Sequence, residues 1–256
     1  MLQVKAQLVK RKIHGAGQEL RLLAPSLAQQ LAPGQPVLVR TGWGLDPYLR
    51  RSFYPVAIDA ESWTLRLPPS GDRGHAWLRM IPEGSELDCL GPVGIGYALP
   101  QDCRHILCLG EGETAWTLLP LIAQADAQHR AVTLAVGATS ARYAIPANRL
   151  PLTAEYRVVT VDGSRGRKGN LASHISDLLA WADAIVVAGS LSFYHQLADF
   201  VQEQRGMLAK GFVQALYPST FLCGTGACLG CVADVAGGRR RVCLRGPVFD
   251  LVDLIR

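Results

Sequence analysis

Four cysteines near the C-terminus have a spacing that suits a small inorganic cluster. They follow the pattern C-x4-C-x2-C-x11-C and are Cys223, Cys228, Cys231 and Cys243. This spacing is known from proteins that bind a [2Fe–2S] cluster. Glycines lie between the first three cysteines, and glycine permits the backbone angles and close approach that a tight loop around a cluster requires. Because such clusters commonly transfer single electrons, the spacing predicts a redox protein.

Zinc, disulfides and ordinary buried thiols are the alternative explanations of these four cysteines. Structural zinc usually takes two chelating pairs of ligands, whereas Cys243 stands alone in the sequence. Disulfides are typical of secreted chains, but seven cysteines is an odd number and no signal peptide opens the sequence. The remaining cysteines, Cys89, Cys103 and Cys108, lie in or beside apolar runs and are expected to be buried thiols.

The composition is that of a folded globular chain. Apolar residues make up 49% of the 256 residues, which is ample for packed cores. No apolar run reaches the length of about 18 residues that a transmembrane helix needs, so we expect no membrane span. The net charge of +5 is mild and its basic residues are mostly scattered, which argues against nucleic-acid binding. Free thiols and the lack of an export signal favour a reducing cytoplasm.

The hydrophobic pattern changes along the chain. Up to about residue 100 it predicts the short strands of an antiparallel β-barrel, at residues 2–9, 19–23, 36–40, 53–58, 63–67 and 86–90. Strands then alternate with helices, which indicates a parallel α/β sheet. The expected strands are 105–109, 131–136, 156–161 and 184–188, and the expected helices are 113–127, 171–181 and 193–204. A strand at 212–216, the cysteine loop and a hairpin through Gly237-Gly238 follow.

The predicted fold class is therefore α+β with several domains. We expect an antiparallel β-barrel at residues 1–100, an α/β domain at 101–210, and a small [2Fe–2S] module at 211–256. This order resembles the electron-transfer subunits of class 1B dihydroorotate dehydrogenases, in the ferredoxin-reductase superfamily. The resemblance implies that the barrel binds FAD and that the α/β domain is of pyridine-nucleotide-binding type. At the level of residues the resemblance is specific in 223–251, including Arg241-Val242-Cys243 and the run from Gly246 to Leu251.

The resemblance implies an oxidoreductase subunit of pyrimidine biosynthesis. Electrons would pass from dihydroorotate to FMN on a partner subunit, then to the cluster, to FAD and to NAD⁺. It also implies a hetero-oligomer with an FMN-containing dihydroorotate dehydrogenase catalytic subunit, or with another dehydrogenase subunit. No residue is expected to be catalytic itself, because the cofactors carry the chemistry.

Three segments resemble the flavin contacts of this family. Residues 51–54 occupy the place of its Arg-Pro-x-Ser motif, residues 74–75 the place of a Gly-Thr pair, and residues 91–97 match its Gly-Pro-Leu-Gly-x-Gly-Phe turn. The implied FAD contacts are Arg51, Ser52, Phe53, Tyr54, Gly74, His75, Gly91, Gly94 and Gly96. Arg51 would donate charge-assisted hydrogen bonds to the pyrophosphate. Tyr54 and His75 depart from the family, which has small hydroxyl residues at both places.

The pyridine-nucleotide site departs further from the family. Glu111 and Glu113 lie in the loop where the family has a glycine-rich phosphate loop, and a carboxylate repels a phosphate. Acidic residues at a helix start are also ordinary capping residues. Ala188-Gly189-Ser190 replaces a Cys-Gly-Pro motif. NAD(H) binding therefore stays open, with two alternatives: a cluster-bearing assembly or binding subunit with a degenerate nucleotide site, or the flavin subunit of another NAD(P)H oxidoreductase complex.

Overall fold

The chain folds into two compact units in a computed structural model that describes residues 1–14 and 16–255. The first, called the barrel unit, consists of Met1–Gly96, Ser219–Ala233 and Arg241–Pro247. The second, called the α/β unit, consists of Tyr97–Pro218, Asp234–Arg240 and the residues from Val248 onward. The domain boundaries expected near residues 100 and 210 stay a prediction.

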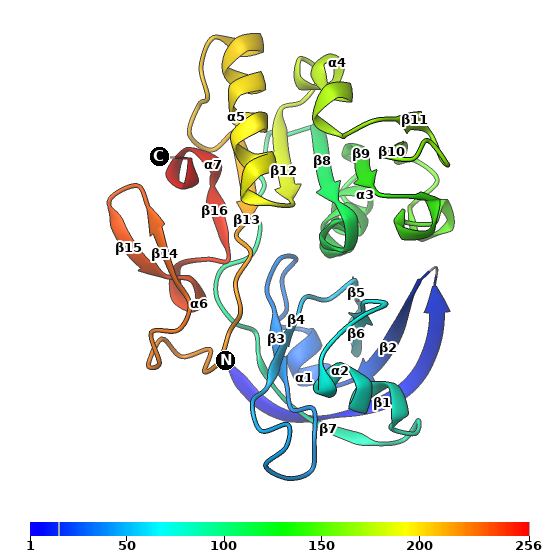
Figure 1. The fold of residues 1–256 in the computed structure, drawn as a ribbon. Coiled ribbons are helices and arrows are strands. Elements are labelled where there is room, and N and C mark those ends of the chain that lie inside the picture. Colours follow the sequence, from blue (N-terminus) through cyan, green and yellow to red (C-terminus); the bar gives the residue numbers. More distant parts are fainter. Residues whose placement is uncertain (15, 256) are drawn as a thin grey trace. The chain divides into compact units, whose positions relative to one another are not determined.

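A curled antiparallel sheet forms the frame of the barrel unit (Figure 1). Its strands are β1 (Leu2–His14), β2 (Gly17–Leu23), β3 (Val37–Val39), β4 (Arg51–Phe53), β5 (Ala57–Ile58), β6 (Ser62–Leu67) and β7 (Glu86–Gly91). Their order is β4-β3-β7-β1-β2-β6-β5, with every neighbouring pair antiparallel. The predicted antiparallel barrel is thus confirmed as an open half-barrel whose edge strands are β4 and β5.

Alternating side chains make the core of the barrel unit. Along the first half of β1 the residues alternate between the two faces, and the inward side chains of Ala6 and Leu8 are fully buried. They pack with Leu20, Leu22 and Trp63 from β2 and β6. The packing explains why the alternating apolar pattern was sufficient to predict these strands.

Two helices of the barrel unit were not predicted from the sequence. They are α1 (Pro25–Ala28) and α2 (Arg73–Met80). Asp72 caps α2, because its side chain accepts a hydrogen bond from the backbone N–H of His75. Gly74 and Leu78, four residues apart, are the buried positions of this helix. Residues 74–75, for which the sequence analysis predicted only a flavin contact, therefore lie in the first turn of a helix.

The α/β unit contains a sheet that is parallel except at one edge (Figure 1). Its strands are β8 (His105–Glu111), β9 (Ala131–Ala138), β10 (Glu155–Thr160), β11 (Arg167–Lys168), β12 (Ala184–Ala188), β13 (Val213–Leu216) and β16 (Val248–Asp250). The order is β11-β10-β9-β8-β12-β13-β16, and only β16 pairs antiparallel. The parallel α/β architecture predicted from the alternation of strands and helices is confirmed.

The helices of the α/β unit differ in part from the prediction. The 3₁₀ helices are η1 (Gly112–Leu118), η2 (Ala141–Tyr143), η3 (Ala147–Arg149) and η4 (Ala172–His174), and the α-helices are α3 (Leu119–Ala127), α4 (Ser176–Leu179), α5 (Leu191–Arg205) and α7 (Leu251–Leu254). The predicted helix 193–204 is confirmed as α5. In the described ranges, no helix is long and apolar enough to cross a membrane.

Two of the predicted helices are interrupted for local reasons. The helix expected at 113–127 starts as 3₁₀ and becomes α-helical only at Leu119, because Pro120 fits the first turn of a helix but not its interior. The helix expected at 171–181 is wrong as a continuous element, since only η4 and α4 form. There the Asn170 side chain accepts hydrogen bonds from the N–H and hydroxyl of Ser173, a local arrangement that competes with a helix.

The C-terminal segment contains the predicted hairpin. It is formed by β14 (Val232–Val235) and β15 (Gly238–Arg241), and both Gly237 and Gly238 have the positive φ angles of a tight turn. The short helix α6 (Val242–Arg245) follows and carries Cys243. This helix was not predicted from the sequence.

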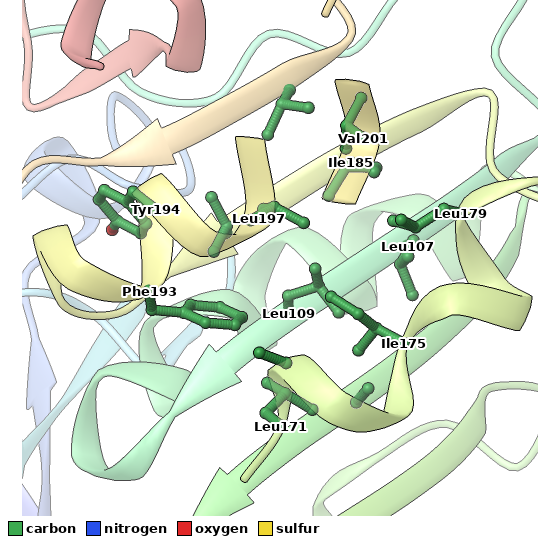
Figure 2. Close-up of a cluster of buried hydrophobic side chains, with 14 of the residues drawn as sticks. Leu107, Leu109, Leu171, Ile175, Leu179, Ile185, Phe193, Tyr194, Leu197 and Val201 are labelled. Atoms are coloured by element: carbon green, nitrogen blue, oxygen red, sulfur yellow. The ribbon is translucent and has the colours of Figure 1, made fainter. Parts of the chain in front are cut away.

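The core of the α/β unit gathers side chains from α5, η4, α4 and the sheet. Figure 2 shows this cluster, with Leu107, Leu109, Leu171, Ile175, Leu179, Ile185, Phe193, Tyr194, Leu197 and Val201 labelled. The inner strand β12 is buried along its whole length, which is typical of a parallel strand covered on both faces. Tyr194 is fully buried, and its hydroxyl accepts the N–H of Gly189 at 3.0 Å and donates to the carbonyl of Leu216.

Tyr194→Phe is expected to lower the free energy of unfolding by about 1–3 kcal/mol, because two buried backbone groups lose their partner. Urea denaturation of the variant and of the parent protein measures the difference. Tyr48→Phe is the control, since Tyr48 is 64% exposed and its change should stay within about 0.5 kcal/mol. Equal midpoints for the two variants would contradict this account of Tyr194.

Candidate iron–sulfur and flavin sites

The four cysteines lie on the 219–231 loop and on α6, all within the barrel unit. Cys228 is exposed and Cys223 half-buried, whereas Cys231 and Cys243 are buried. Three residues of the loop have positive φ angles: Gly224 (72°), Gly226 (80°) and Leu229 (56°). Glycine adopts such angles readily, whereas leucine does so rarely. The predicted ligands are therefore presented from a tight loop on one side and a helix on the other.

The structure brings the cysteines together as two pairs. The side chain of Cys223 interacts with that of Cys228, and the side chain of Cys243 with that of Cys231. The N–H of Gly230 donates to Cys228 Sγ and the N–H of Cys243 donates to Cys231 Sγ, both at 3.4 Å. Such N–H groups aimed at sulfur are a means of tuning a cluster's potential.

Paired thiols suit a two-iron cluster. In the part of the chain that the structure describes, no three His, Cys, Asp or Glu side chains converge closely enough to hold one metal ion. A [2Fe–2S] cluster takes four cysteines shared between two irons, and the thiols of the cysteine loop and α6 supply that donor set.

The thiols differ in acidity. The Thr225 hydroxyl, helped by hydrogen bonds from Cys228, lowers the pKa of Cys223 to about 6. Burial, together with the neighbouring Cys231, raises the pKa of Cys243 to about 12. Cys223 is thus the more acidic of these two thiols, and a bound cation would favour the thiolate form of both.

Close packing explains two glycines of the cysteine loop. A Cβ at Gly224 would lie 3.0 Å from Leu38 Cδ1, and a Cβ at Gly226 would lie 2.6 Å from Leu244 Cδ1. The guanidinium of Arg241 donates to the carbonyl of Gly226 at 3.1 Å. The loop is therefore fixed directly on β3 and α6.

The 91–97 segment holds the chain that follows Cys243. A Cβ at Gly94 would lie 2.0 Å from the carbonyl oxygen of Gly246, and the N–H of Ile95 donates to that oxygen at 2.5 Å. A Cβ at Gly96 would lie 2.3 Å from the carbonyl oxygen of Pro33. Packing of backbone on backbone accounts for both glycines, and their contact with FAD stays a prediction. Gly91 ends β7, where a Cβ would lie 3.3 Å from Val37.

Arg51, Phe53, Gly74 and His75 come together at the start of α2. The Arg51 Nε and Asp72 Oδ2 atoms are 2.6 Å apart, and Asp72 Oδ1 lies 2.9 Å from His75 Nδ1. The rings of Phe53 and His75 meet edge to face at 5.5 Å. Burial disfavours the charged form of Asp72, but hydrogen bonds from His75 and Arg51 outweigh it and hold the carboxyl pKa well below its usual range.

Thr41 completes this group and was missed from the sequence. A Cβ at Gly74 would lie 2.5 Å from Thr41 Oγ1 and 3.2 Å from Arg51 Nε. Thr41 is fully buried, and its hydroxyl has no hydrogen-bond partner among the described residues. A buried hydroxyl, a guanidinium and the N–H groups of a helix start together fit a phosphate. The signal in the sequence was weak: one threonine two residues after a buried strand.

Ser52 and Tyr54 are the remaining predicted flavin contacts. Ser52 lies on β4, where it pairs with Leu38, and Tyr54 follows directly after the strand. Both side chains are half-buried. All nine predicted residues thus lie in the barrel unit. Four of them meet at the start of α2, three lie in the 91–97 segment, and Ser52 and Tyr54 lie on or directly after β4.

A cleft of about 630 Å³ lies within the α/β unit. Both segments predicted to contact a pyridine nucleotide contribute to it, through Glu111, Glu113 and Ser190. It lies at the carboxyl ends of β8, β9 and β12, the edge at which parallel sheets of this kind bind ligands. The structure therefore places the predicted nucleotide segments around one cavity.

Comparison with known proteins supports the same assignment. Residues 219–255 match the iron–sulfur cluster binding domain of dihydroorotate dehydrogenase B. The chain is 27% identical to the dihydroorotate dehydrogenase B (NAD(+)) electron transfer subunit of Lysinibacillus sphaericus over 255 residues, 96% of this chain and 92% of that protein. It is 28% identical to the subunit of the same name from Desulforamulus reducens, covering 88% and 87% of the two chains. Over almost its whole length the chain is similar to these electron-transfer subunits.

Solved structures show the same fold. The structure of an NADH-dependent reduced ferredoxin-NADP oxidoreductase superposes with a TM-score of 0.79 at 21% identity, over 97% of this chain and 89% of that one. The ferredoxin reductase of carbazole 1,9a-dioxygenase gives a TM-score of 0.64 at 18% identity, over 80% and 65% of the two chains. The chain therefore has the fold of these reductases, and its residues 219–255 match the iron–sulfur cluster binding domain.

Proposed function

We propose that this chain is an electron-transfer subunit that binds one [2Fe–2S] cluster and FAD and passes electrons between a partner dehydrogenase and NAD(H). The supporting observation is the paired arrangement of Cys223 with Cys228 and Cys231 with Cys243, in a domain that matches the iron–sulfur domain of dihydroorotate dehydrogenase B. Dihydroorotate oxidation in pyrimidine biosynthesis is the proposed setting. The two relatives are named dihydroorotate dehydrogenase B electron transfer subunits, and this chain aligns with 92% and 87% of their lengths.

The chain's own residues would hold and tune the cluster. Cys223, Cys228, Cys231 and Cys243 would supply the four thiolates, and the N–H groups of Gly230 and Cys243 donate to sulfur. When bound, the cluster exchanges single electrons and the flavin two, so together they connect hydride chemistry to single-electron transfer. The exposed Cys228 and Leu229 leave one side of the loop open to an electron donor or acceptor.

The FAD pyrophosphate is proposed to bind at the start of α2. Arg51 supplies the positive charge, Thr41 a buried hydroxyl in need of a partner, and the first turn of α2 its N–H groups. The carboxylate of Asp72 forms hydrogen bonds with Arg51 and with His75 and so restricts both side chains. The flavin contacts predicted at Ser52, Phe53 and Tyr54 lie on or directly after β4, next to Arg51.

The proposed partner is an FMN-containing catalytic subunit, which makes the assembly a hetero-oligomer. Free cysteines throughout the described chain fit a reducing compartment, and we propose the cytoplasm. A second candidate is a cluster-bearing binding or assembly subunit with a degenerate nucleotide site. The observation in its favour is Glu111, a carboxylate that lines the cleft of the α/β unit.

Spectroscopy under anoxia distinguishes the two candidates. The protein is purified without oxygen, its absorption spectrum is recorded, and NADH is added. The electron-transfer subunit shows flavin and iron–sulfur absorption that bleach as NADH is oxidised. A binding or assembly subunit keeps the iron–sulfur absorption but shows no flavin that NADH can bleach, which would contradict the proposal.

Arg51→Ala is expected to weaken FAD binding by about 10- to 100-fold, since a charge-assisted hydrogen bond contributes about 1.5–3 kcal/mol. Fluorescence titration of the flavin-free protein measures the dissociation constant. The control is Arg73→Ala, because Arg73 also lies at the start of α2 but is exposed and pairs with Asp46 at 2.8 Å. Equal FAD affinity in the two variants would show that Arg51 does not hold the flavin.

A further inference from the structure

The carboxylate of Glu111 lies in the cleft of the α/β unit at the N-terminus of α5, an environment that favours an anion. Its Oε2 atom accepts the backbone N–H of Ser190 at 3.0 Å and the hydroxyl of Ser190 at 2.9 Å. Ser190 is the cap of α5, a helix of 15 residues whose N-terminus carries partial positive charge. The chain's own carboxylate thus takes hydrogen bonds that a phosphate would otherwise receive at this edge of the sheet.

The carboxylate of Glu111 is held in a built position. A Cβ at Gly189 would lie 2.9 Å from Glu111 Oε2 and 3.0 Å from Phe193 Cδ1, so the carboxylate packs directly against the backbone. The hydroxyl of Thr114 lies within hydrogen-bond distance of the carbonyl oxygens of Glu111, at 2.7 Å, and Ala188, at 2.9 Å. These contacts link the β8 end to the β12 end and fix Glu111 where the two strands meet.

The charged side chains that line the cleft also disfavour a phosphate. Among the described residues that line it are two carboxylates, Glu111 and Glu113, and no lysine, arginine or histidine. Its other lining groups are hydroxyls, an amide, glycines and apolar side chains, such as Thr139, Asn170 and Leu171. Nothing in this lining neutralises a phosphate, whereas carboxylates and hydroxyls accept hydrogen bonds from the hydroxyl and amine groups of a nucleoside.

We infer that Glu111 is a specificity residue that competes with phosphate groups for the start of α5 and weakens the binding of phosphate-bearing nucleotides in this cleft. The inference rests on the proposed function, because it concerns the NAD(H) step. A dinucleotide enters either by displacing Glu111 from Ser190 or by placing its phosphates beside a negative charge. Both routes weaken the binding of the dinucleotide. A nucleoside has no phosphate group, so Glu111 does not weaken its binding in either way.

Neutralising Glu111 separates this role from a purely structural one. Glu111→Gln keeps the size of the side chain and an oxygen that accepts the Ser190 N–H, but removes the charge. We expect the variant to bind NAD⁺ about tenfold or more tightly than the parent, with the affinity for adenosine unchanged. The experiment is isothermal titration of the full chain, carrying its cluster and flavin, with each of the two ligands.

The control is Glu203→Gln, which removes the same charge from an exposed position nearer the other end of α5. It should change neither affinity. Glu111→Ala, which removes the charge without introducing an amide, should give the same order of affinities if Glu111→Gln proves unstable. Unchanged or weaker NAD⁺ binding in the Glu111 variants would overturn the inference, as would an equal gain for adenosine.

The same samples keep this inference separate from the proposed function. Iron and FAD are quantified before each titration, so a protein that lacks both refutes the electron-transfer role. If iron and FAD are present and neither the parent nor the Glu111 variants bind NAD⁺, the inference fails while the cofactor assignment stands.

Discussion

Cys228→Ser abolishes the iron–sulfur cluster while both units stay folded. Cys228 is exposed on the cysteine loop, so replacing its sulfur by oxygen removes one of four ligands without disturbing a packed core. We expect the iron content of anaerobically prepared protein to fall from about two per chain to near zero. Iron analysis and the visible absorption spectrum measure the loss, and far-ultraviolet circular dichroism checks the fold.

Cys103→Ser provides the matched control for this prediction. Cys103 lies in the α/β unit outside the cysteine loop, and the structure assigns it no role beyond burial. Its replacement should leave the iron content unchanged. Full iron content in Cys228→Ser, or equal loss in both variants, would contradict the ligand assignment.

Gly94→Ala is expected to lower the free energy of unfolding by about 3 kcal/mol or more. Gly94 has a φ angle of 73°, which alone costs an alanine about 1–2 kcal/mol. Its new Cβ would also lie 2.0 Å from the carbonyl oxygen of Gly246, so the chain beyond Cys243 must move. Because that chain holds the last cluster ligand in place, the iron content should fall as well.

Gly84→Ala separates the two causes. Gly84 has a φ angle of 89°, but a Cβ there would meet nothing within 4 Å. It should therefore show only the conformational cost of about 1–2 kcal/mol and keep its iron. Urea denaturation and iron analysis of both variants test the difference, and equal stability with equal iron would show that Gly94 does not position the cluster-bearing tail.

Local patterns were enough to predict the frame of the molecule. The cysteine spacing lies within 21 residues of chain, from Cys223 to Cys243, and its glycines reflect a local need for unusual backbone angles. Most strands of both sheets followed from alternating or continuous apolar runs, because burial on one or both faces dictates those patterns. The short strands β11 and β16 were not predicted, and the single strand expected at 53–58 is divided into β4 and β5. Helix α2 was missed since its start depends on one capping residue, Asp72, and its apolar face is short.

The contacts that decide the sites are far apart in the sequence. Glu111 meets Ser190 across 79 residues, and Arg51 meets Asp72 across 21. Which carboxylate reaches which donor depends on how the strands are ordered in the sheet, and no periodicity records that order. The residue type of Glu111 led to the expectation that it repels a phosphate, whereas its partner Ser190 at the start of α5 could not be predicted. Thr41 became noticeable only through the burial of its hydroxyl.

Electron paramagnetic resonance of the anaerobically prepared and chemically reduced protein tests the central claim most directly, when combined with metal analysis of the same sample. The account predicts about two irons per chain and the signal of a single unpaired electron from a reduced [2Fe–2S] cluster. A silent spectrum from protein that contains stoichiometric zinc, or no metal, would contradict it.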